Sequence, residues 1–270
     1  MKLNNNSENK YADVPLRVKT WVFIILIFSL GVSQTITMAI FVSWIGFQVF
    51  LEFYRMFQLK GKGAIFSTIV GITQFCLLYF FNIKNYFSYT LIFSLVVILF
   101  FIIKKETLKK ILGIAIGLIL GVFIFPYLFF LRESTWGLKT LIFLVVITEL
   151  NDVFQYLMGK SLGKHKIASK ISPNKTREGL VGGVFLTIIL SNLLGYFLLP
   201  SSIFINTLLG IILGVLGFFG DIFMSFIKRK TNVKDTGKLL PGHGGLLDRM
   251  DSLIFNAPIF FWILPLLFKS

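Results

Sequence analysis

The chain has 270 residues, of which 56% are hydrophobic and only 14% are charged. A soluble globular domain carries about 25% charged residues, so this composition excludes that class and indicates an integral membrane protein. The formal net charge of +15 raises the question of a nucleic-acid partner. Membrane proteins, however, concentrate Lys and Arg in short cytoplasmic loops. We therefore expect membrane lipids, and no nucleic acid, as partners of the basic residues.

The N-terminal segment 1–19 is polar and lacks the basic, apolar and cleavage regions of a secretory signal. We expect it to be a cytoplasmic tail. Cys76 is the single cysteine and lies in an apolar run. The sequence therefore predicts no internal disulfide and no cysteine metal site.

Apolar runs recur after the tail, and about 20 such residues are needed to cross a bilayer. A span must satisfy its own backbone hydrogen bonds, so we predict an all-α, polytopic fold. Nine spans are expected, at 20–34, 36–54, 64–82, 86–103, 108–131, 138–157, 180–199, 203–227 and 253–268. We divide them into N-terminal transmembrane helices, 20–131, and a C-terminal region, 132–270. The cytoplasmic loops of that region are 158–179 and 228–252.

The basic residues alternate with the predicted spans. The N-terminal segment and the loops after the second, fourth, sixth and eighth spans hold 23 of the 27 Lys and Arg residues. Short cytoplasmic loops carry such an excess, so we place the N-terminus inside and the C-terminus outside. For the first three of these basic segments, fixing this orientation is a sufficient explanation, because they carry no other motif.

Acidic residues gather in the C-terminal region, which orientation alone does not explain. Seven of the twelve lie in or beside its two cytoplasmic loops, namely Glu149, Asp152, Glu178, Asp221, Asp235, Asp248 and Asp251. Carboxylates near hydrocarbon are costly, so each is a functional candidate by default. Both histidines, His165 and His243, lie in the same loops.

The first group of polar residues follows the sixth span. On a helix, Asp152, Tyr156, Gly159 and Gly163 line one stripe, with the acid near the membrane surface. Ser172 and the proline after it then open a basic loop suited to phosphate oxygens. A helix end followed by a solvated turn would look similar, so this group alone does not decide between the two readings.

The second group is more specific. Asp221, Ser225 and Lys228 are spaced by four and three residues and share one helix face. Asp248 and Asp251 are three apart and are expected to point to one place. Carboxylates without Cys are hard oxygen ligands, typical of Mg²⁺ that bridges substrate phosphates. Basic residues interleaved with them neutralise phosphate charge, and the Pro-Gly-His-Gly-Gly turn at 241–245 brings backbone N–H groups close to a polyphosphate.

At these residues the sequence resembles the phosphatidate cytidylyltransferase (CDP-diacylglycerol synthase) family. The pattern of Ser, Lys-Arg, Lys-Asp, Gly, Pro-x-His-Gly-Gly and Asp-Arg-x-Asp runs complete from Ser225 to Asp251. The Gly220-Asp221 pair before it matches as well. Further upstream the matching residues are Gly163, Lys164, His165, Ile171, Ser172, Pro173, Lys175, Thr176, Glu178 and Gly179. Gln155, Asn174 and Arg177 stand where that family has a small residue, Lys and Trp. These departures leave the acids untouched and concern the loop that would select the lipid.

The resemblance implies transfer of a cytidylyl group from CTP to phosphatidic acid, forming CDP-diacylglycerol and pyrophosphate, with Mg²⁺ as cofactor and Mn²⁺ as a substitute. It implies an enzyme in the bacterial inner (cytoplasmic) membrane with its active site facing the cytoplasm, and we consider a homodimer. The catalytic residues are then Asp221, Ser225, Lys228, Lys234, Asp235, His243, Asp248, Arg249 and Asp251, of which Asp221, Asp248 and Asp251 bind metal. The substrate-binding residues are Asp152, His165, Ser172, Lys175, Glu178, Arg229, Gly244 and Gly245.

Two other functions fit part of the pattern. A CTP-dependent polyprenol or lipid kinase also needs acids and basic loops, but it transfers the γ-phosphate and releases CDP. A membrane transporter would place charges near the middle of its spans. Here the middles of the spans lack acids apart from borderline cases such as Glu52. We therefore rank the transporter below either enzyme.

Overall fold

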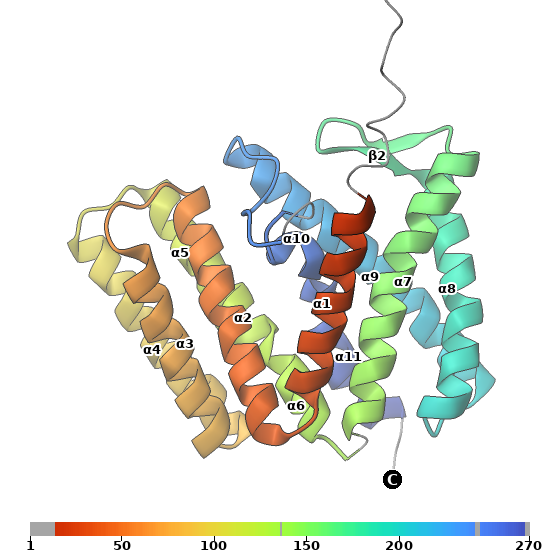
Figure 1. Ribbon diagram of the computed structural model, residues 1–270, viewed down its shortest axis with the longest axis horizontal. Helices are drawn as coiled ribbons and strands as arrows, with labels where there is room; N and C mark the ends of the chain where they lie inside the picture. Colours follow the sequence, from red (N-terminus) through yellow and green to blue (C-terminus); the bar gives the residue numbers. More distant parts are fainter. Residues whose placement is uncertain (1–13, 136, 241–243, 268–270) are drawn as a thin grey trace, which may run out of the picture.

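The computed structural model describes residues 14–135, 137–240 and 244–267, and helices dominate it (Figure 1). The helices of the N-terminal half are α1 (Val14–Val32), α2 (Thr35–Met56), α3 (Gly63–Phe80), α4 (Ile83–Ile103), α5 (Leu108–Leu118) and α6 (Pro126–Glu133), with the π-helical segment η1 (Ile119–Ile124) before α6. The C-terminal half contains α7 (Gly137–Leu162), β1 (Lys166–Ala168), β2 (Ser172–Thr176), α8 (Arg177–Leu198), α9 (Ile203–Lys230), α10 (Leu247–Met250) and α11 (Leu253–Leu267).

The helices coincide with the predicted spans, and the all-α polytopic prediction is confirmed. Seven described segments are long and apolar enough to cross a membrane, namely Thr35–Met56, Gly63–Phe80, Ile83–Ile103, Leu108–Glu133, Gly137–Leu162, Arg177–Leu198 and Ile203–Lys230. The described apolar helices at Val22–Val32 and Leu253–Leu267 are shorter, so the count of nine spans is not confirmed. Helix α1 begins at Val14, inside the segment predicted to be the tail.

The helices divide into a centre and a lipid-facing shell. In α2 and in the segment Leu108–Glu133, 67% of the most apolar window is buried inside the protein, against 22% in α4 and in α8. Apolar side chains on the outer helices, such as Phe80 and Tyr196, are mostly exposed. In water such a surface would be unfavourable, but lipid tails are as apolar as these side chains. Helix α2 is therefore a central helix, and this places its single acid, Glu52, deep in the fold.

Within the predicted span 108–131, the π-helical segment η1 interrupts the α-helix just before Pro126. Pro126 has no N–H to donate to the carbonyl four residues earlier, and the Phe125 N–H reaches back five residues to Leu120. The carbonyls of Gly121 and Val122 are thereby freed. Side chains from two other helices satisfy them: Gln74 Nε2 donates to Gly121 O at 3.1 Å and Tyr86 Oη donates to Val122 O at 2.8 Å.

The loop predicted at 158–179 is instead a helix end followed by a β-hairpin. Strands β1 and β2 are antiparallel, with Lys166 opposite Thr176 and Ala168 opposite Ser172. The hydroxyl of Thr176 accepts the Gly179 N–H at 3.0 Å and so caps the start of α8. The strands were missed because they are short and lack alternating apolar residues.

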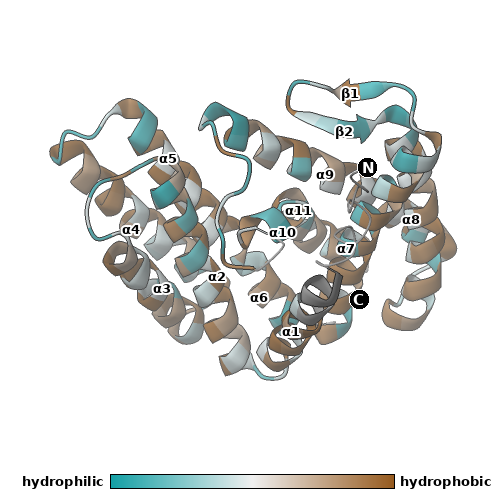
Figure 2. Cartoon of the chain, turned by 45° about the horizontal axis from the view of Figure 1, so that its top comes forward, coloured by the Kyte–Doolittle hydropathy of each residue, from teal (hydrophilic) through white to brown (hydrophobic). Residues whose placement is uncertain are grey.

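Polar segments gather at one end of the helix bundle. The β-hairpin, the end of α9 and the segment after it lie at the same end as the start of α1, whereas α11 ends at the opposite end (Figure 1). Hydropathy colouring shows much of the hairpin and of the segment directly after α9 as hydrophilic, and the outer helix surfaces as largely hydrophobic (Figure 2). This end holds most of the residues predicted to form the site.

Candidate active site

Three carboxylates from separate elements form the first half of the site. Asp152 lies on α7, Asp221 on α9, and Asp251 between α10 and α11. The Ser252 hydroxyl donates to Asp152 Oδ2 at 2.6 Å and so ties α7 to the segment before α11. Asp221 and Asp152 in turn act electrostatically on Asp251, which is 8% exposed. Like charges this close repel one another, so the group favours a cation.

Lys175 of β2 supplies a cation at this place. Its ammonium lies 2.5 Å from Asp221 Oδ2 and 3.5 Å from Gln155 Oε1. Burial disfavours the charged ammonium, but the carboxylates of Asp221 and Asp152 outweigh burial and raise the pKa of Lys175. The lysine therefore stays charged and holds the carboxylates together.

Burial, followed by repulsion from Asp221 and Asp152, raises the pKa of Asp251 well above its ordinary value. The position of Asp251 depends on Gly220, because a Cβ atom at residue 220 would collide with the Asp251 carbonyl oxygen. Only a glycine lets α9 approach the backbone of 251–252 this closely. Gly220 thus brings Asp221, the next residue on α9, close to Asp251.

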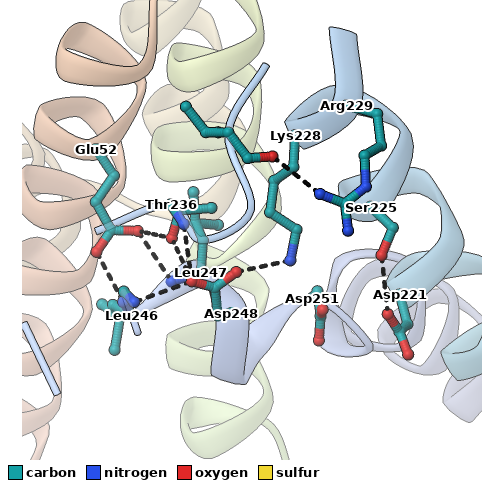
Figure 3. A network of polar contacts seen from close by, with 12 residues as sticks. Glu52, Asp221, Ser225, Lys228, Arg229, Thr236, Leu246, Leu247, Asp248 and Asp251 are labelled. Carbon is teal, nitrogen blue, oxygen red and sulfur yellow. Dashed lines mark hydrogen bonds and ion pairs between the residues drawn. The ribbon is translucent and has the colours of Figure 1, made fainter. Parts of the chain in front are cut away.

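Asp248 and Lys228 form the second half of the site. The Lys228 ammonium lies 2.7 Å from Asp248 Oδ1, and their side chains are 12% and 9% exposed. Asp248 Oδ2 accepts the backbone N–H groups of Thr236 at 2.8 Å and Gly245 at 2.9 Å, and lies 3.1 Å from the Thr236 hydroxyl (Figure 3). Asp248 therefore uses Oδ2 to hold the segment between α9 and α10, and Oδ1 to pair with Lys228 on α9.

This arrangement bears on the predicted metal ligands Asp221, Asp248 and Asp251. Asp248 contacts Thr236, Gly245 and Lys228, whereas the carboxylates that act most strongly on Asp251 are Asp221 and Asp152. Lys228 links the two carboxylates, because its ammonium pairs with Asp248 Oδ1 and also acts electrostatically on Asp251. That Asp248 and Asp251 point to one place stays a prediction. Within the described part of the chain, no group of three or more His, Cys, Asp or Glu side chains is arranged to hold a metal ion.

The face shared by Asp221 and Ser225 is present as predicted, with the Ser225 hydroxyl 3.4 Å from Asp221 Oδ1 (Figure 3). Lys228 continues along the same helix toward Asp248. The stripe predicted on α7 is less uniform, because Tyr156 is 60% exposed while Asp152 is half-buried. Arg249 is half-buried, and its Nε atom is fully buried without a hydrogen-bond partner.

Several residues predicted to bind substrate hold the hairpin and loops together in this structure. Glu178 accepts the backbone N–H groups of Lys164 and His165 at 3.0 and 3.1 Å, and its other oxygen lies 2.6 Å from His165 Nδ1. Arg229 donates to the carbonyls of Ile171 at 3.4 Å and Val233 at 3.3 Å. These contacts brace the hairpin against the end of α9.

The remaining predicted residues lie nearby on the same polar end. Ser172 is half-buried at the start of β2. Lys234 and Asp235 are exposed. Gly244 has φ +87°, a conformation that favours glycine, and a Cβ atom there would lie 2.7 Å from Asp248 Oδ2. His243 lies outside the described residues.

Sequence reasoning missed four residues that shape the site, which are Glu52, Gln155, Thr236 and Ser252. Gln155 was noted only as a departure from a pattern, yet its Nε2 donates to Asn151 Oδ1 and to Gly214 O, both at 3.1 Å, joining α7 to α9. Glu52 carried one available signal, which was an acid within an apolar run. Thr236 and Ser252 act through contacts distant in sequence, for which no local pattern exists.

The profile of the cytidylyltransferase family matches residues 15–267 of this chain. The chain belongs to the cytidylyltransferase family. It is 37% identical over 274 residues to the uncharacterized protein YnbB of Escherichia coli (strain K12), a match that covers 95% of this chain and 89% of that protein. Membership in this family makes the chain a nucleotidyltransferase and an integral membrane enzyme, and the transporter reading is set aside.

Phosphatidate cytidylyltransferases are also similar. The protein of that name from Staphylococcus epidermidis (strain ATCC 35984) is 34% identical over 209 residues, which is 77% of this chain and 70% of that protein. The one from Staphylococcus aureus (strain COL) is 42% identical over 135 residues, 49% of this chain and 52% of that protein. The resemblance drawn from the sequence motifs is thereby confirmed at the level of the family.

Proposed function

We propose that this cytidylyltransferase joins CTP to phosphatidic acid, forming CDP-diacylglycerol and pyrophosphate. The observation that carries the proposal is the group of Asp152, Asp221 and Asp251 around Lys175, at the polar end of lipid-facing helices. A site of this kind holds anions and cations together beside the bilayer. The names of the staphylococcal relatives support the same lipid substrate.

The reaction needs charge neutralisation more than proton transfer. An oxygen of the lipid phosphate forms a new bond to the α-phosphorus of CTP, while the bond from that phosphorus to the bridging oxygen breaks and pyrophosphate leaves. A phosphate monoester is ionised at neutral pH, so no base is required. The obstacle is repulsion between two anions, which positioned cations reduce as charge shifts in the transition state. Lys175, Lys228 and Arg249 are the cations we assign to this role, supported by the ion pairs of the two lysines and by the electrostatic effect of Arg249 on Asp152.

The site residues fit a divalent cation, which we propose to be Mg²⁺ with Mn²⁺ as a substitute. Mg²⁺ is usually held by one or two carboxylates together with substrate phosphates and waters, so a complete protein cage is not needed. Asp152 Oδ1 is buried without a hydrogen-bond partner, and Lys175 already sets a positive charge against Asp221. Asp221 and Asp251, with Asp152 beside them, would hold the ion, which would neutralise phosphate charge and align the displacement.

We further propose that this enzyme lies in a bacterial inner membrane with the site facing the cytoplasm. The basic excess of the loops at the polar end supports this orientation. CTP is a cytoplasmic nucleotide, and the phosphatidate headgroup lies at the same surface while its acyl chains stay in the bilayer. A reporter fused at Lys230 should behave as cytoplasmic and one fused after Ser270 as extracytoplasmic, and both on one side would contradict the proposal.

Labelled CTP separates this function from the lipid-kinase alternative. Purified protein is incubated with phosphatidic acid, Mg²⁺ and CTP labelled on either the α- or the γ-phosphate. Label from the α-position should appear in the lipid, and label from the γ-position should appear only in pyrophosphate. Label from the γ-position in the lipid, with CDP in solution, would establish the kinase instead.

A further inference from the structure

We propose that Glu52 of α2 is a positioning residue for the active site, because it anchors the segment that carries Thr236 and leads into Asp248. The first half of the chain would then contribute a residue to a site otherwise built from the second half. The anchoring itself rests on geometry alone. Its effect on catalysis also rests on the function proposed above.

Glu52 is completely buried and accepts hydrogen bonds from the far segment. Its Oε1 accepts the Leu246 N–H at 2.7 Å, and its Oε2 accepts the Leu247 N–H at 3.1 Å. The Thr236 hydroxyl donates to the same Oε2 at 2.7 Å. Among the described residues, no Lys, Arg or His pairs with Glu52. A buried carboxylate is costly unless hydrogen-bonded, so these donors are what make its position tolerable.

Thr236 connects Glu52 to the second half of the site, which is formed by Asp248 and Lys228 (Figure 3). Its hydroxyl lies 2.7 Å from Glu52 Oε2 and 3.1 Å from Asp248 Oδ2, while its backbone N–H donates to the same Asp248 oxygen at 2.8 Å. One hydroxyl hydrogen serves one acceptor well, and the shorter distance assigns it to Glu52. Glu52 therefore fixes Thr236, and the N–H of Thr236 fixes Asp248 beside Lys228.

The residues that follow α9 pack closely around the Glu52 carboxylate. Cβ atoms added at Gly237 and Gly245 would lie 3.3 Å from Glu52 Oε1 and 2.7 Å from Glu52 Oε2. Glutamine at residue 52 would turn an amide NH₂ toward the N–H of either Leu246 or Leu247, so one donor would face another. Aspartate would be shorter by one methylene group. The geometry thus requires both oxygens at the end of a glutamate side chain.

Limited trypsin digestion of the full chain in detergent tests the anchor without any assay of activity. Cleavage after Lys234 and Lys238, which flank Thr236, is compared with cleavage after Lys170 in the hairpin. Glu52→Gln and Thr236→Val should speed cleavage at the flanking sites about tenfold, because loss of the anchor permits local opening. Thr236→Ser keeps the hydroxyl and should stay close to wild type. Glu106→Gln makes the same chemical change at the Lys110 ion pair and is the matched control.

Kinetics then test the positioning role. Glu52→Gln and Thr236→Val should lower kcat about 10- to 100-fold, the range seen when the partner that orients a ligand is removed. They should also raise the KM for CTP, because Lys228 beside Asp248 is one of the cations proposed to neutralise phosphate charge, whereas a smaller folded fraction would lower the rate without moving the KM. Thr236→Ser should restore both quantities.

The outcomes separate the two proposals. Unchanged cleavage in Glu52→Gln would overturn the anchor, and wild-type kinetics in both Glu52→Gln and Thr236→Val would overturn the positioning role. If wild-type protein transfers no cytidylyl group while the cleavage pattern holds, the proposed function fails and the anchor stands.

Discussion

The ammonium of Lys175 lies 2.5 Å from Asp221 Oδ2, so a lysine of the β-hairpin reaches a carboxylate of α9. Asp152 and Asp251 also act electrostatically on this lysine. The ammonium thus occupies a place where a divalent cation would be attracted by the same carboxylates. Lys175 and a bound cation are therefore expected to compete for Asp221, and the lysine is free to turn toward a substrate phosphate once the cation binds.

Replacing Lys175 by Met should have opposite effects on rate and on metal affinity. The rate should fall about 100-fold, because one stabilising donor is lost from the transition state. The Mg²⁺ concentration for half-maximal rate should fall, because the competing ammonium is gone. Steady-state kinetics at varied Mg²⁺ measure both, with Lys170→Met in the hairpin turn as the control. A weaker apparent affinity for Mg²⁺ in Lys175→Met would contradict the competition.

Metal affinity should depend on pH in a defined direction. Burial and the neighbouring carboxylates raise the pKa of Asp251, so its carboxyl keeps a proton to higher pH than an ordinary aspartate. A cation must displace that proton, so Mn²⁺ should bind more tightly as the pH rises through the raised pKa. Electron paramagnetic resonance of free Mn²⁺ in detergent measures this binding. Asp251→Asn should flatten the dependence, and an equal slope in that variant would assign the proton elsewhere.

The sequence predicted those parts of the fold that depend on local pattern. Apolar runs located the helices, and the spacing of Asp221 and Ser225 placed them on one face because a helix repeats every 3.6 residues. The family motifs likewise led to the residues around Lys228 and Asp248. Each of these inferences needs only residues that are close in the chain.

Long-range contacts explain what the sequence could not show. The bond from Thr236 to Glu52 joins residues 184 positions apart. The break at η1 depends on Tyr86 and Gln74 satisfying freed carbonyls from other helices. One oxygen of Asp248 accepts from Thr236 and the other pairs with Lys228 on α9, which no spacing rule reveals. A sequence motif therefore identifies which carboxylates are important, whereas the structure is needed to identify the residues that they contact.

Asp248 and Lys228 should behave as a coupled buried pair. Removing one partner of such a pair leaves an unpaired charge and costs about 3–5 kcal/mol of the free energy of unfolding. Asp248→Asn should also abolish turnover, since an amide NH₂ must face either Lys228 or the donors from Thr236 and Gly245. The double variant Lys228→Met with Asp248→Asn should lose less stability than the two single losses combined. Unfolding in detergent measures this, and additive losses would show that the two side chains act independently.

Gly220 should be intolerant of even one added methyl group. In Gly220→Ala the new Cβ atom would collide with the Asp251 carbonyl oxygen and lie 3.1 Å from Ser252 Cα, so α9 and the segment 251–252 must move apart. Overpacking of this kind costs about 1–3 kcal/mol, and here it also shifts Asp251 and the bond from Ser252 to Asp152.

Gly217→Ala is the matched control, one turn earlier on α9. Its added Cβ atom would meet only the ends of side chains, with Asn151 Nδ2 at 3.1 Å and Asn256 Nδ2 at 3.3 Å as the nearest atoms, and these can shift at lower cost. The midpoint temperature of thermal unfolding in detergent and the kcat/KM for CTP should both fall further in Gly220→Ala than in Gly217→Ala. Equal activity in the two variants would mean that the close approach of α9 to Asp251 is not needed for catalysis, and that the carboxylate reaches its working position by another route.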